Sequence, residues 1–301
     1  MTARVAAVDI GSNSTRLLVA DVEDGTLREV ERLLEITRLG DGVDASGALA
    51  ADAMTRVERC VAEYARRAAD LGASQPLAVA TSAVRDAANG GAFLERLVSR
   101  TGVLAMLLSG DEEARMTLRG VSSARPAGEP VVVCDIGGGS TELIAGNGSD
   151  VTFATSLDMG CVRMSERHLV SDPPQPSEIA ALRDQVRSML PSDVPGGMLI
   201  GVAGTVTTIA AIDLGLDREV PELIDGHRLA AGVVATQLDR LAGMPLAERR
   251  HVRGLMPERA PTIVAGTAIL AEVLDHLGAD AILVSERDIL HGAALTAAGG
   301  A

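Results

Sequence analysis

The sequence contains no lysine, so its 27 basic residues are all arginine. The Walker A loop of P-loop ATPases needs a lysine beside the phosphates, and protein kinases and Schiff-base enzymes depend on one for catalysis. These three classes are therefore excluded. Arginine, which remains, is well suited to bidentate contacts with phosphate.

Aromatic residues make up only 1 % of the chain, although 47 % of it is hydrophobic. The core must therefore be built from Ala, Val, Leu and Ile, which suits a buried parallel or mixed sheet covered by alanine-rich helices. The three cysteines lie far apart and include no Cys-x-x-Cys pair, which predicts reduced thiols in a cytoplasmic protein. No apolar run approaches the roughly 20 residues of a membrane span. The first strand follows directly on the N-terminus, so we expect neither a signal peptide nor a membrane partner.

The chain is acidic, with a formal net charge of −14. This charge argues against nucleic acid as a main partner, and a polyanionic substrate would need a local basic groove. The five histidines show no spacing typical of a zinc site, so we assign them no metal role.

Two segments of the chain share one pattern: Asp9-Ile-Gly-Ser-Asn-Ser-Thr15 and Asp135-Ile-Gly-Gly-Gly-Ser-Thr141. Each lies between two apolar runs, which predicts a strand, a tight turn and a second strand. Gly and Asn tolerate positive φ, so such a turn can direct successive N–H groups and hydroxyls towards phosphate oxygens. Asp9 and Asp135, beside these turns, are candidate ligands of Mg²⁺. Two such hairpins suggest two similar domains that clamp one phosphorylated ligand between them.

Ser109 and Glu112 match a capping box at the start of a helix, which gives Glu112 a structural role. Glu113 has no such role and lies in the first turn, where the helix dipole favours an ionised carboxylate. A carboxylate beside a bound phosphate can position a water molecule and partly deprotonate it. Glu113 is therefore a candidate general base.

Two further segments carry candidate phosphate contacts. Gly201-Val-Ala-Gly-Thr205 follows an apolar strand and opens a helix, and glycine-rich turns at helix N-termini bind phosphate through their N–H groups. Arg85 follows the predicted strand 77–80, at a strand end where sites of α/β proteins usually lie. It can contact a phosphate bidentately.

Strands alternate with helices twice along the chain, which predicts an α/β protein of two duplicated domains. The first domain is expected over 1–124, joined by a last helix at about 288–301, and the second over 125–287, with a linker near 123–130. Helices are expected over 49–71, 176–190, 204–214, 227–241 and 262–277. The apolar faces of helices 176–190 and 227–241 predict either core or a dimer interface, and core is favoured.

These residues resemble the exopolyphosphatase / guanosine-pentaphosphate phosphatase family, part of the superfamily of sugar kinases, chaperone ATPases and actin. The resemblance covers almost the whole chain and corresponds to the short, two-domain branch. It rests on six segments: Ala7–Ser14, Ala80–Arg85, Leu108–Arg115, Asp135–Glu142, Gly204–Thr208 and Ser285–Gly292. Arg259-Ala-Pro261 departs from the family pattern, which usually has Asp in place of Pro261.

The resemblance implies two ribonuclease-H-like domains with an interdomain cleft, a magnesium cofactor and a homodimer. Glu113 corresponds to the family's catalytic base, and Asp135 and Glu142 correspond to carboxylates near the magnesium. The phosphate contacts correspond to Ser12, Asn13, Arg85, Gly138, Ser140 and Thr205.

The implied reaction is hydrolysis of a terminal phosphoanhydride of inorganic polyphosphate, with release of orthophosphate. Hydrolysis of guanosine pentaphosphate is the nearest alternative, because the same loops would serve both substrates. A small-molecule kinase of the same superfamily and a non-enzymatic nucleotide sensor are the remaining alternatives. Glu113, Asp135 and Glu142 weigh against the sensor, because a protein that only binds a nucleotide needs no water-activating carboxylate.

Overall fold

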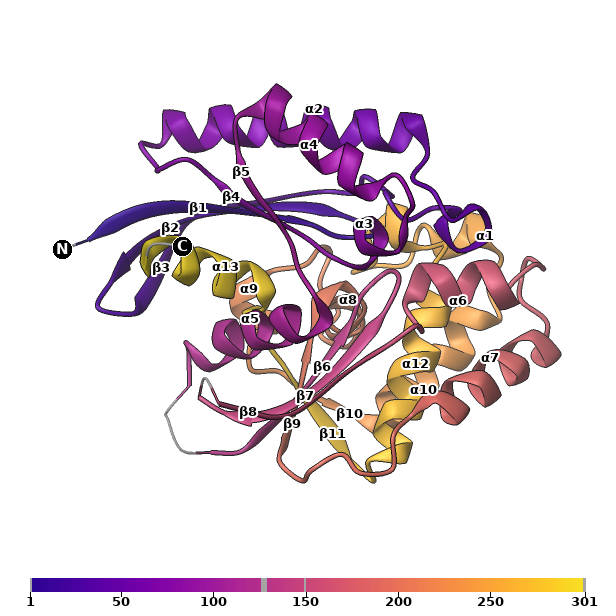
Figure 1. Ribbon diagram of the computed structural model, residues 1–301. Coiled ribbons are helices and arrows are strands. Elements are labelled where there is room, and N and C mark those ends of the chain that lie inside the picture. The colour runs from indigo at the N-terminus through magenta and orange to yellow at the C-terminus, as the bar shows by residue number, and fades with distance from the viewer. Residues whose placement is uncertain (1, 126–128, 149, 300–301) are drawn as a thin grey trace. The chain divides into compact units, whose positions relative to one another are not determined.

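One sheet arrangement occurs twice in the chain (Figure 1). The structure, a computed structural model, describes residues 2–125, 129–148 and 150–299. It divides into unit 1, which spans Met1–Gly128, Asn147–Val151 and Arg287–Ala301, and unit 2, which spans Glu129–Gly146 and Thr152–Glu286. The predicted linker at 123–130 includes residues 126–128, which lie outside the described residues.

Unit 1 is a five-stranded sheet in the order β3-β2-β1-β4-β5, with helices on both faces. Strand β2 pairs antiparallel with both β1 and β3, whereas β4 pairs parallel with β1 and β5 pairs parallel with β4. Its elements are β1 (Ala3–Ile10), β2 (Thr15–Glu23), β3 (Thr26–Glu35), α1 (Val43–Ser46), α2 (Ala51–Asp70), β4 (Leu77–Ala80), α3 (Ser82–Asp86), α4 (Gly90–Thr101), β5 (Leu104–Leu107), α5 (Gly110–Ser122) and α13 (Ile289–Gly299). Helices α2 and α4 pack on one face and α5 and α13 on the other (Figure 1).

The last helix, α13, packs directly against α5 within unit 1. A Cβ on Gly120 of α5 would lie 1.9 Å from the carbonyl oxygen of Asp288, and one on Gly292 of α13 would lie 1.9 Å from that of Met116. Only glycine permits so close an approach of one backbone to another. These two glycines therefore let the C-terminal segment pack beside the sheet of unit 1.

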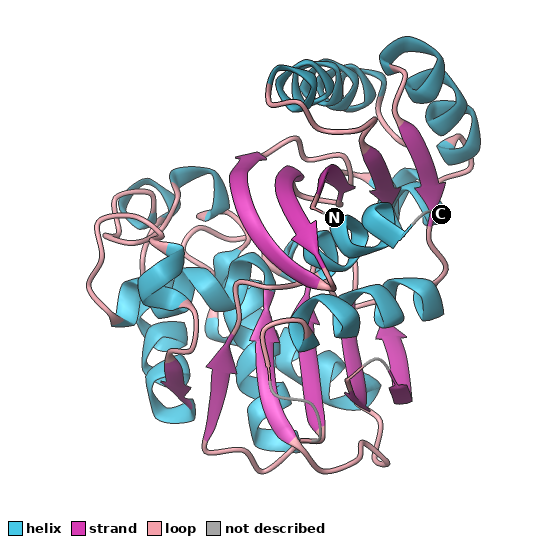
Figure 2. Ribbon diagram, turned by 90° about the vertical axis from the view of Figure 1, so that its left-hand side faces the viewer, coloured by secondary structure: helices cyan, strands magenta, loops and turns pink. Residues whose placement is uncertain are grey.

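Unit 2 repeats the arrangement and extends it by one strand. Its sheet has the order β8-β7-β6-β9-β11-β10, in which β6 pairs antiparallel with β7 and parallel with β9. Figure 2 shows the strands of both sheets as magenta arrows. The elements of unit 2 are β6 (Val131–Ile136), β7 (Thr141–Asn147), β8 (Asp150–Leu157), α6 (Cys161–His168), α7 (Pro176–Met189), β9 (Met198–Val202), α8 (Ala203–Asp213), α9 (Pro221–Ile224), β10 (Arg228–Ala230), α10 (Ala231–Ala242), α11 (Leu246–Arg249), the 3₁₀ helix η1 (Pro257–Arg259), α12 (Ile263–His276) and β11 (Ala281–Val284). The predicted α/β duplication is confirmed.

One predicted helix begins in the wrong place. Residues 228–230, expected as the first turn of helix 227–241, instead form β10, which pairs antiparallel with β11 and sets Leu229 opposite Ile282. Helix α10 starts only at Ala231. Apolar spacing over so short a segment fits either element, and here a strand partner some fifty residues away decides between them.

The cores are poor in aromatic residues, as the composition requires. Buried Ala, Val, Leu and Ile side chains dominate on both faces of the unit 1 sheet and throughout unit 2. The apolar faces of α7 and α10 belong to the unit 2 core through Leu182, Val186, Val234 and Leu238, so the prediction of core for them is confirmed. All three cysteines are free and buried. Within the described ranges, every helix is too short or too polar to cross a membrane.

Candidate phosphate-binding loops and carboxylates

The two hairpins predicted from the repeated motif have the same backbone geometry. In unit 1, β1 and β2 pair with Ile10 opposite Thr15, and the Gly11 N–H donates to the Ser14 carbonyl at 3.0 Å. In unit 2, β6 and β7 pair with Ile136 opposite Thr141, and the Gly137 N–H donates to the Ser140 carbonyl at 3.0 Å. The repeated sequence therefore folds into one kind of turn twice.

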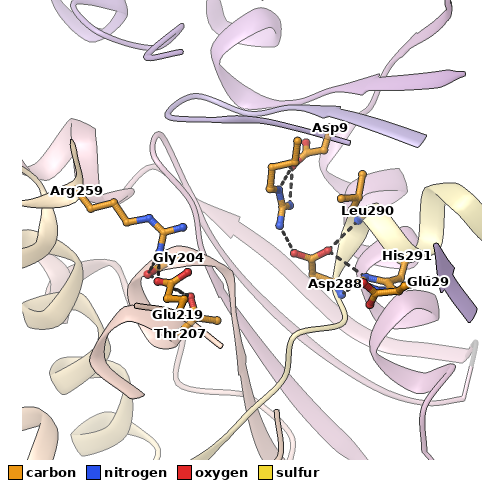
Figure 3. Close-up of polar contacts among 10 residues, drawn as sticks. Asp9, Glu29, Gly204, Thr207, Glu219, Arg259, Asp288, Leu290 and His291 are labelled. Carbon is orange, nitrogen blue, oxygen red and sulfur yellow. Dashed lines mark hydrogen bonds and ion pairs between the residues drawn. The ribbon is translucent and has the colours of Figure 1, made fainter. Parts of the chain in front are cut away.

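The aspartate of the first hairpin lies directly opposite an arginine. The Nε and NH2 groups of Arg16 donate to Asp9 Oδ2 at 2.9 and 2.6 Å, and its NH1 donates to Asp288, which precedes α13 (Figure 3). The side chains of Asp9 and Asp288 are buried, and that of Arg16 is 11 % exposed. Burial raises the pKa of Asp9, and Arg16 offsets only part of this effect. Burial also acts to raise the pKa of Asp288, but the charge of Arg16, the hydrogen bond with His291 and the charge of Arg32 together outweigh it, so the pKa lies below its ordinary value.

Asp9, predicted as a magnesium ligand, thus has a guanidinium as its partner. Arg16, whose charge is shared between two carboxylates, is correspondingly less suited to bind a polyanion than an arginine at a basic surface. The contact with Asp288 joins residues at opposite ends of the chain, so no local pattern could have indicated it.

The turn of the first hairpin is held by two neighbouring segments. The carbonyl oxygens of Ser12 and Asn13 accept hydrogen bonds from the N–H groups of Gly40 and Arg38 at 2.7 and 2.9 Å. The buried Ser12 hydroxyl lies 3.1 Å from that of Ser82, at the start of α3. Asn13 remains partly exposed. These contacts fix the backbone of the turn, as a preformed anion site requires.

Arg85 and Glu113, predicted independently, contact each other in unit 1. Arg85, near the end of α3, donates through NH1 to the Leu108 carbonyl at 2.9 Å and to Glu113 Oε2 at 3.0 Å. Glu113 is buried in the first turn of α5. Both contacts use NH1, so the Nε–NH2 edge of the guanidinium can still meet a phosphate.

The capping box predicted at the start of α5 is confirmed. The Ser109 hydroxyl accepts a hydrogen bond from the Glu112 N–H at 3.3 Å, and the Ser109 N–H donates to Glu112 Oε2 at 2.8 Å. The hydrogen bond from the Ser109 backbone is the main cause that lowers the pKa of Glu112. Glu112 therefore has the structural role expected of it.

The second hairpin has two carboxylates where the first has an ion pair. Asp135 of β6 lies directly opposite Glu142 of β7 in the antiparallel register. Glu142 is buried, and its Oε1 accepts a hydrogen bond from the hydroxyl of Ser156 on β8 at 2.7 Å. Two carboxylates on facing strands are oxygen donors of the kind that a divalent cation takes. Sequence reasoning missed Ser156, because no motif marks it.

The N-terminus of α6 anchors the turn of the second hairpin. The Gly138 carbonyl accepts hydrogen bonds from the N–H groups of Val162 and Arg163 at 2.9 and 3.2 Å, and the Gly139 carbonyl accepts one from Arg163 Nε at 2.7 Å. The N–H is then the remaining backbone polar group of each glycine. Ser140 is buried beside them. The phosphate contacts predicted at Gly138 and Ser140 lie in this turn and stay a prediction.

Thr205 lies in the first turn of α8, directly after β9, as the sequence predicts. It is buried, and a Cβ on Gly266 of α12 would lie 2.4 Å from its hydroxyl oxygen. Ala203, which opens the helix, has a φ of 66°. A glycine on α12 thus makes room for Thr205, while an unusual backbone conformation shapes the turn.

Fold and loops together define a class: proteins of two ribonuclease-H-like units, each with a hairpin of the repeated Asp-Ile-Gly motif on its central strands. The sequence model of the Ppx/GppA phosphatase family matches residues 18–298, and the chain belongs to this family. The fold and family expected from the sequence are thereby confirmed.

Named relatives extend over the full chain. "Exopolyphosphatase 2" of Mycobacterium tuberculosis is 38 % identical over 316 aligned residues, which cover 98 % of this chain and 99 % of the relative. The crystal structure of an exopolyphosphatase-like protein matches with a TM-score of 0.91 at 32 % identity and covers 98 % of this chain and 97 % of its own. A Ppx/GppA family member from Aquifex aeolicus matches with a TM-score of 0.83 at 30 % identity, with the same coverage.

Proposed function

We propose that the protein is an exopolyphosphatase, which hydrolyses the terminal phosphoanhydride of inorganic polyphosphate and releases orthophosphate. The observation that carries this proposal is the similarity, over nearly the full length of both chains, to a protein named exopolyphosphatase. The family name also includes GppA, so guanosine pentaphosphate is the second candidate substrate.

In unit 1, Glu113 is the proposed general base, which orients the attacking water and accepts its proton. Its contact with Arg85 NH1 fixes the orientation of the carboxylate. The Nε–NH2 edge of Arg85 then contacts a phosphate oxygen, so one guanidinium orients both the base and the substrate. Ser12 and Asn13 are proposed as further phosphate contacts of this unit.

In unit 2, we assign Mg²⁺ to Asp135 and Glu142. Magnesium typically binds proteins through one or two carboxylates and completes its shell with waters and substrate phosphates. Asp135 and Glu142, on facing strands, supply two carboxylates of this kind. When bound, the ion neutralises phosphate charge. Gly138, Ser140 and Thr205 are the proposed phosphate contacts of this unit.

A homodimer and a cytoplasmic location complete the proposal. The three cysteines are free, the state that a reducing compartment maintains. Light scattering at micromolar concentration tests the dimer, and a monomer under these conditions would remove that part of the proposal.

The decisive experiment measures phosphate release from polyphosphates of defined length, with Mg²⁺ and with EDTA. We expect release only with Mg²⁺. Guanosine pentaphosphate, added in competition, identifies the preferred substrate. ATP-dependent labelling of an acceptor without phosphate release would instead indicate a kinase. Nucleotide binding without turnover of either substrate would indicate a sensor.

A further inference from the structure

The first turn of α8 is held in an unusual backbone conformation. Ala203, at its first position, has a φ of 66°, which residues with a side chain rarely adopt. Such conformations persist where surrounding contacts over-determine them, and they cluster at binding sites. Contacts from other segments should therefore hold the peptide groups at Ala203, Gly204 and Thr205.

A buried guanidinium lies against this turn. Arg259 NH1 donates to the Gly204 carbonyl at 2.8 Å and to the Thr208 hydroxyl oxygen at 2.7 Å (Figure 3 shows Arg259 and Gly204). A Cβ on Gly204 would lie only 2.8 Å from Arg259 Cζ, so a side chain at residue 204 would displace the guanidinium from this position. Arg259 thus binds the carbonyl side of the turn, which leaves the N–H side for an anion.

Glu219 holds Arg259 in this position. Its Oε1 forms an ion pair with Arg259 NH1 at 2.5 Å and accepts from the Thr208 hydroxyl at 2.7 Å. Thr208 therefore donates to Glu219 while its oxygen accepts from Arg259, and the three side chains form a closed triangle. Glu219 precedes α9 and belongs neither to α8 nor to the segment of Arg259. Its carboxylate therefore fixes the position of Arg259 from a third segment of the chain. It also compensates the arginine charge where both side chains are largely buried.

We infer that Glu219 is a positioning residue for the phosphate loop at the start of α8. It acts through Arg259 and Thr208, and it touches neither the substrate nor the reacting atoms. The inference rests on the proposed function to the extent that the α8 turn binds phosphate. A carboxylate that only stabilised the fold would leave phosphate affinity unchanged in the folded protein, and this difference makes the two roles separable.

The chain supplies a matched control. Asp217, two residues before Glu219, accepts from Arg253 Nε at 2.6 Å, so a second carboxylate–arginine pair joins the same two segments. This pair is exposed, with 85 % of the Asp217 side chain and 65 % of the Arg253 side chain accessible. Exposed pairs contribute little. Asp217→Ala therefore removes an ion pair between these segments without touching α8.

The test measures binding of imidodiphosphate, whose P–N–P bridge resists hydrolysis, by calorimetry on the full chain, alongside thermal melts. Glu219→Ala should weaken binding about tenfold, because a tenfold change in Kd corresponds to the net contribution of roughly one hydrogen bond. Glu219→Gln keeps an acceptor for Arg259 and should retain most of the affinity. Asp217→Ala should bind like the wild type. Wild-type affinity in Glu219→Ala, or equal weakening in Asp217→Ala, would overturn the inference.

A double-mutant cycle tests whether Glu219 acts through Arg259. Arg259→Lys keeps a charge but cannot reproduce the planar fork of donors, so it should weaken imidodiphosphate binding. If the residues form one unit, Glu219→Ala combined with Arg259→Lys should bind no worse than the weaker single variant. Fully additive losses would contradict the inference. The readout is binding, so a wild-type protein that fails to hydrolyse polyphosphate would refute the proposed function and leave this test intact.

Discussion

The two hairpins share a backbone and differ in charge at one position. Asp9 faces Arg16 across the strands of unit 1, and Asp135 faces Glu142 at the corresponding position of unit 2. The first pair is an internally compensated ion pair. The second is a pair of like charges that a cation would stabilise. The duplicated turn thus carries different charges in the two units, because the residue opposite the aspartate is an arginine in unit 1 and a glutamate in unit 2.

The two units also differ in the catalytic groups that we propose for them. Unit 1, with the compensated hairpin, has the buried Glu113 held by Arg85, and unit 2 has the carboxylate pair. If this division is correct, substitutions in the two units should affect different measurable quantities: the rate of the chemical step for unit 1 and the magnesium requirement for unit 2.

The largest effect is expected at Glu113. Glu113→Gln keeps an oxygen that accepts from Arg85 but removes the proton-accepting carboxylate, so kcat should fall by about 10²–10⁴-fold. The magnesium requirement should not change. Glu112→Gln is the control, because glutamine also completes a capping box and should leave kcat unchanged. The reverse result, with Glu112→Gln inactive and Glu113→Gln active, would exchange the two assignments. Phosphate release under saturating substrate measures both.

Arg16→Met should strongly destabilise the protein. It removes the arginine partner of the buried Asp9 and Asp288 carboxylates, of which Asp288 keeps contacts with Leu290 and His291. Breaking a buried pair in this way typically costs about 3–5 kcal/mol. Denaturant titration measures the loss. Arg59→Met, which breaks an exposed pair with Glu35, should cost no more than about 1 kcal/mol.

A double variant sharpens this prediction. Arg16→Met with Asp288→Asn removes one of the two carboxylate charges that Arg16 compensated and should recover part of the lost stability. A double variant less stable than Arg16→Met would mean that Asp288 contributes through contacts other than Arg16.

The metal assignment predicts an effect of intermediate size in unit 2. Asp135→Asn and Glu142→Gln should each raise the Mg²⁺ concentration for half-maximal activity, by about 10–100-fold if removal of a ligand compares with removal of its support. Asp9→Asn, at the corresponding position of the first hairpin, should leave this concentration unchanged. Calorimetric Mg²⁺ binding provides a second readout. An equal shift in all three variants would abolish the distinction between the hairpins.

Whether a contact could be predicted from the sequence depends on how far apart its residues lie along the chain. Both hairpins and the Ser109–Glu112 capping box follow from contiguous patterns, so they were predictable. The contacts that give the hairpins their character join remote segments. Arg16 reaches Asp288, and Ser156 reaches Glu142 from another strand. Tertiary packing brings such partners together, and no periodic pattern in the sequence marks them.

The roles of single residues also depend on partners that the motif alone does not identify. Asp9 and Asp135 look equivalent in the motif, and both were predicted as magnesium ligands. The residue after Thr15 and after Thr141 carries the difference between them. That residue becomes informative only when the antiparallel register places it opposite the aspartate. Arg85 and Glu113 were likewise predicted separately, and their contact with each other emerged only from the fold.

The smallest expected effect has the opposite sign to that of Arg16→Met. In EDTA, Glu142→Gln should stabilise the protein by about 0.2–1 kcal/mol, because it removes one of two like charges at a cross-strand position while keeping an acceptor for Ser156. Saturating Mg²⁺ should erase or reverse the difference, because the wild type gains more from the ion. Denaturant titrations with and without Mg²⁺ measure both. If Glu142→Gln were destabilising in EDTA, the charge of Glu142 would stabilise the fold without a metal, and the two hairpins would not differ in the way proposed.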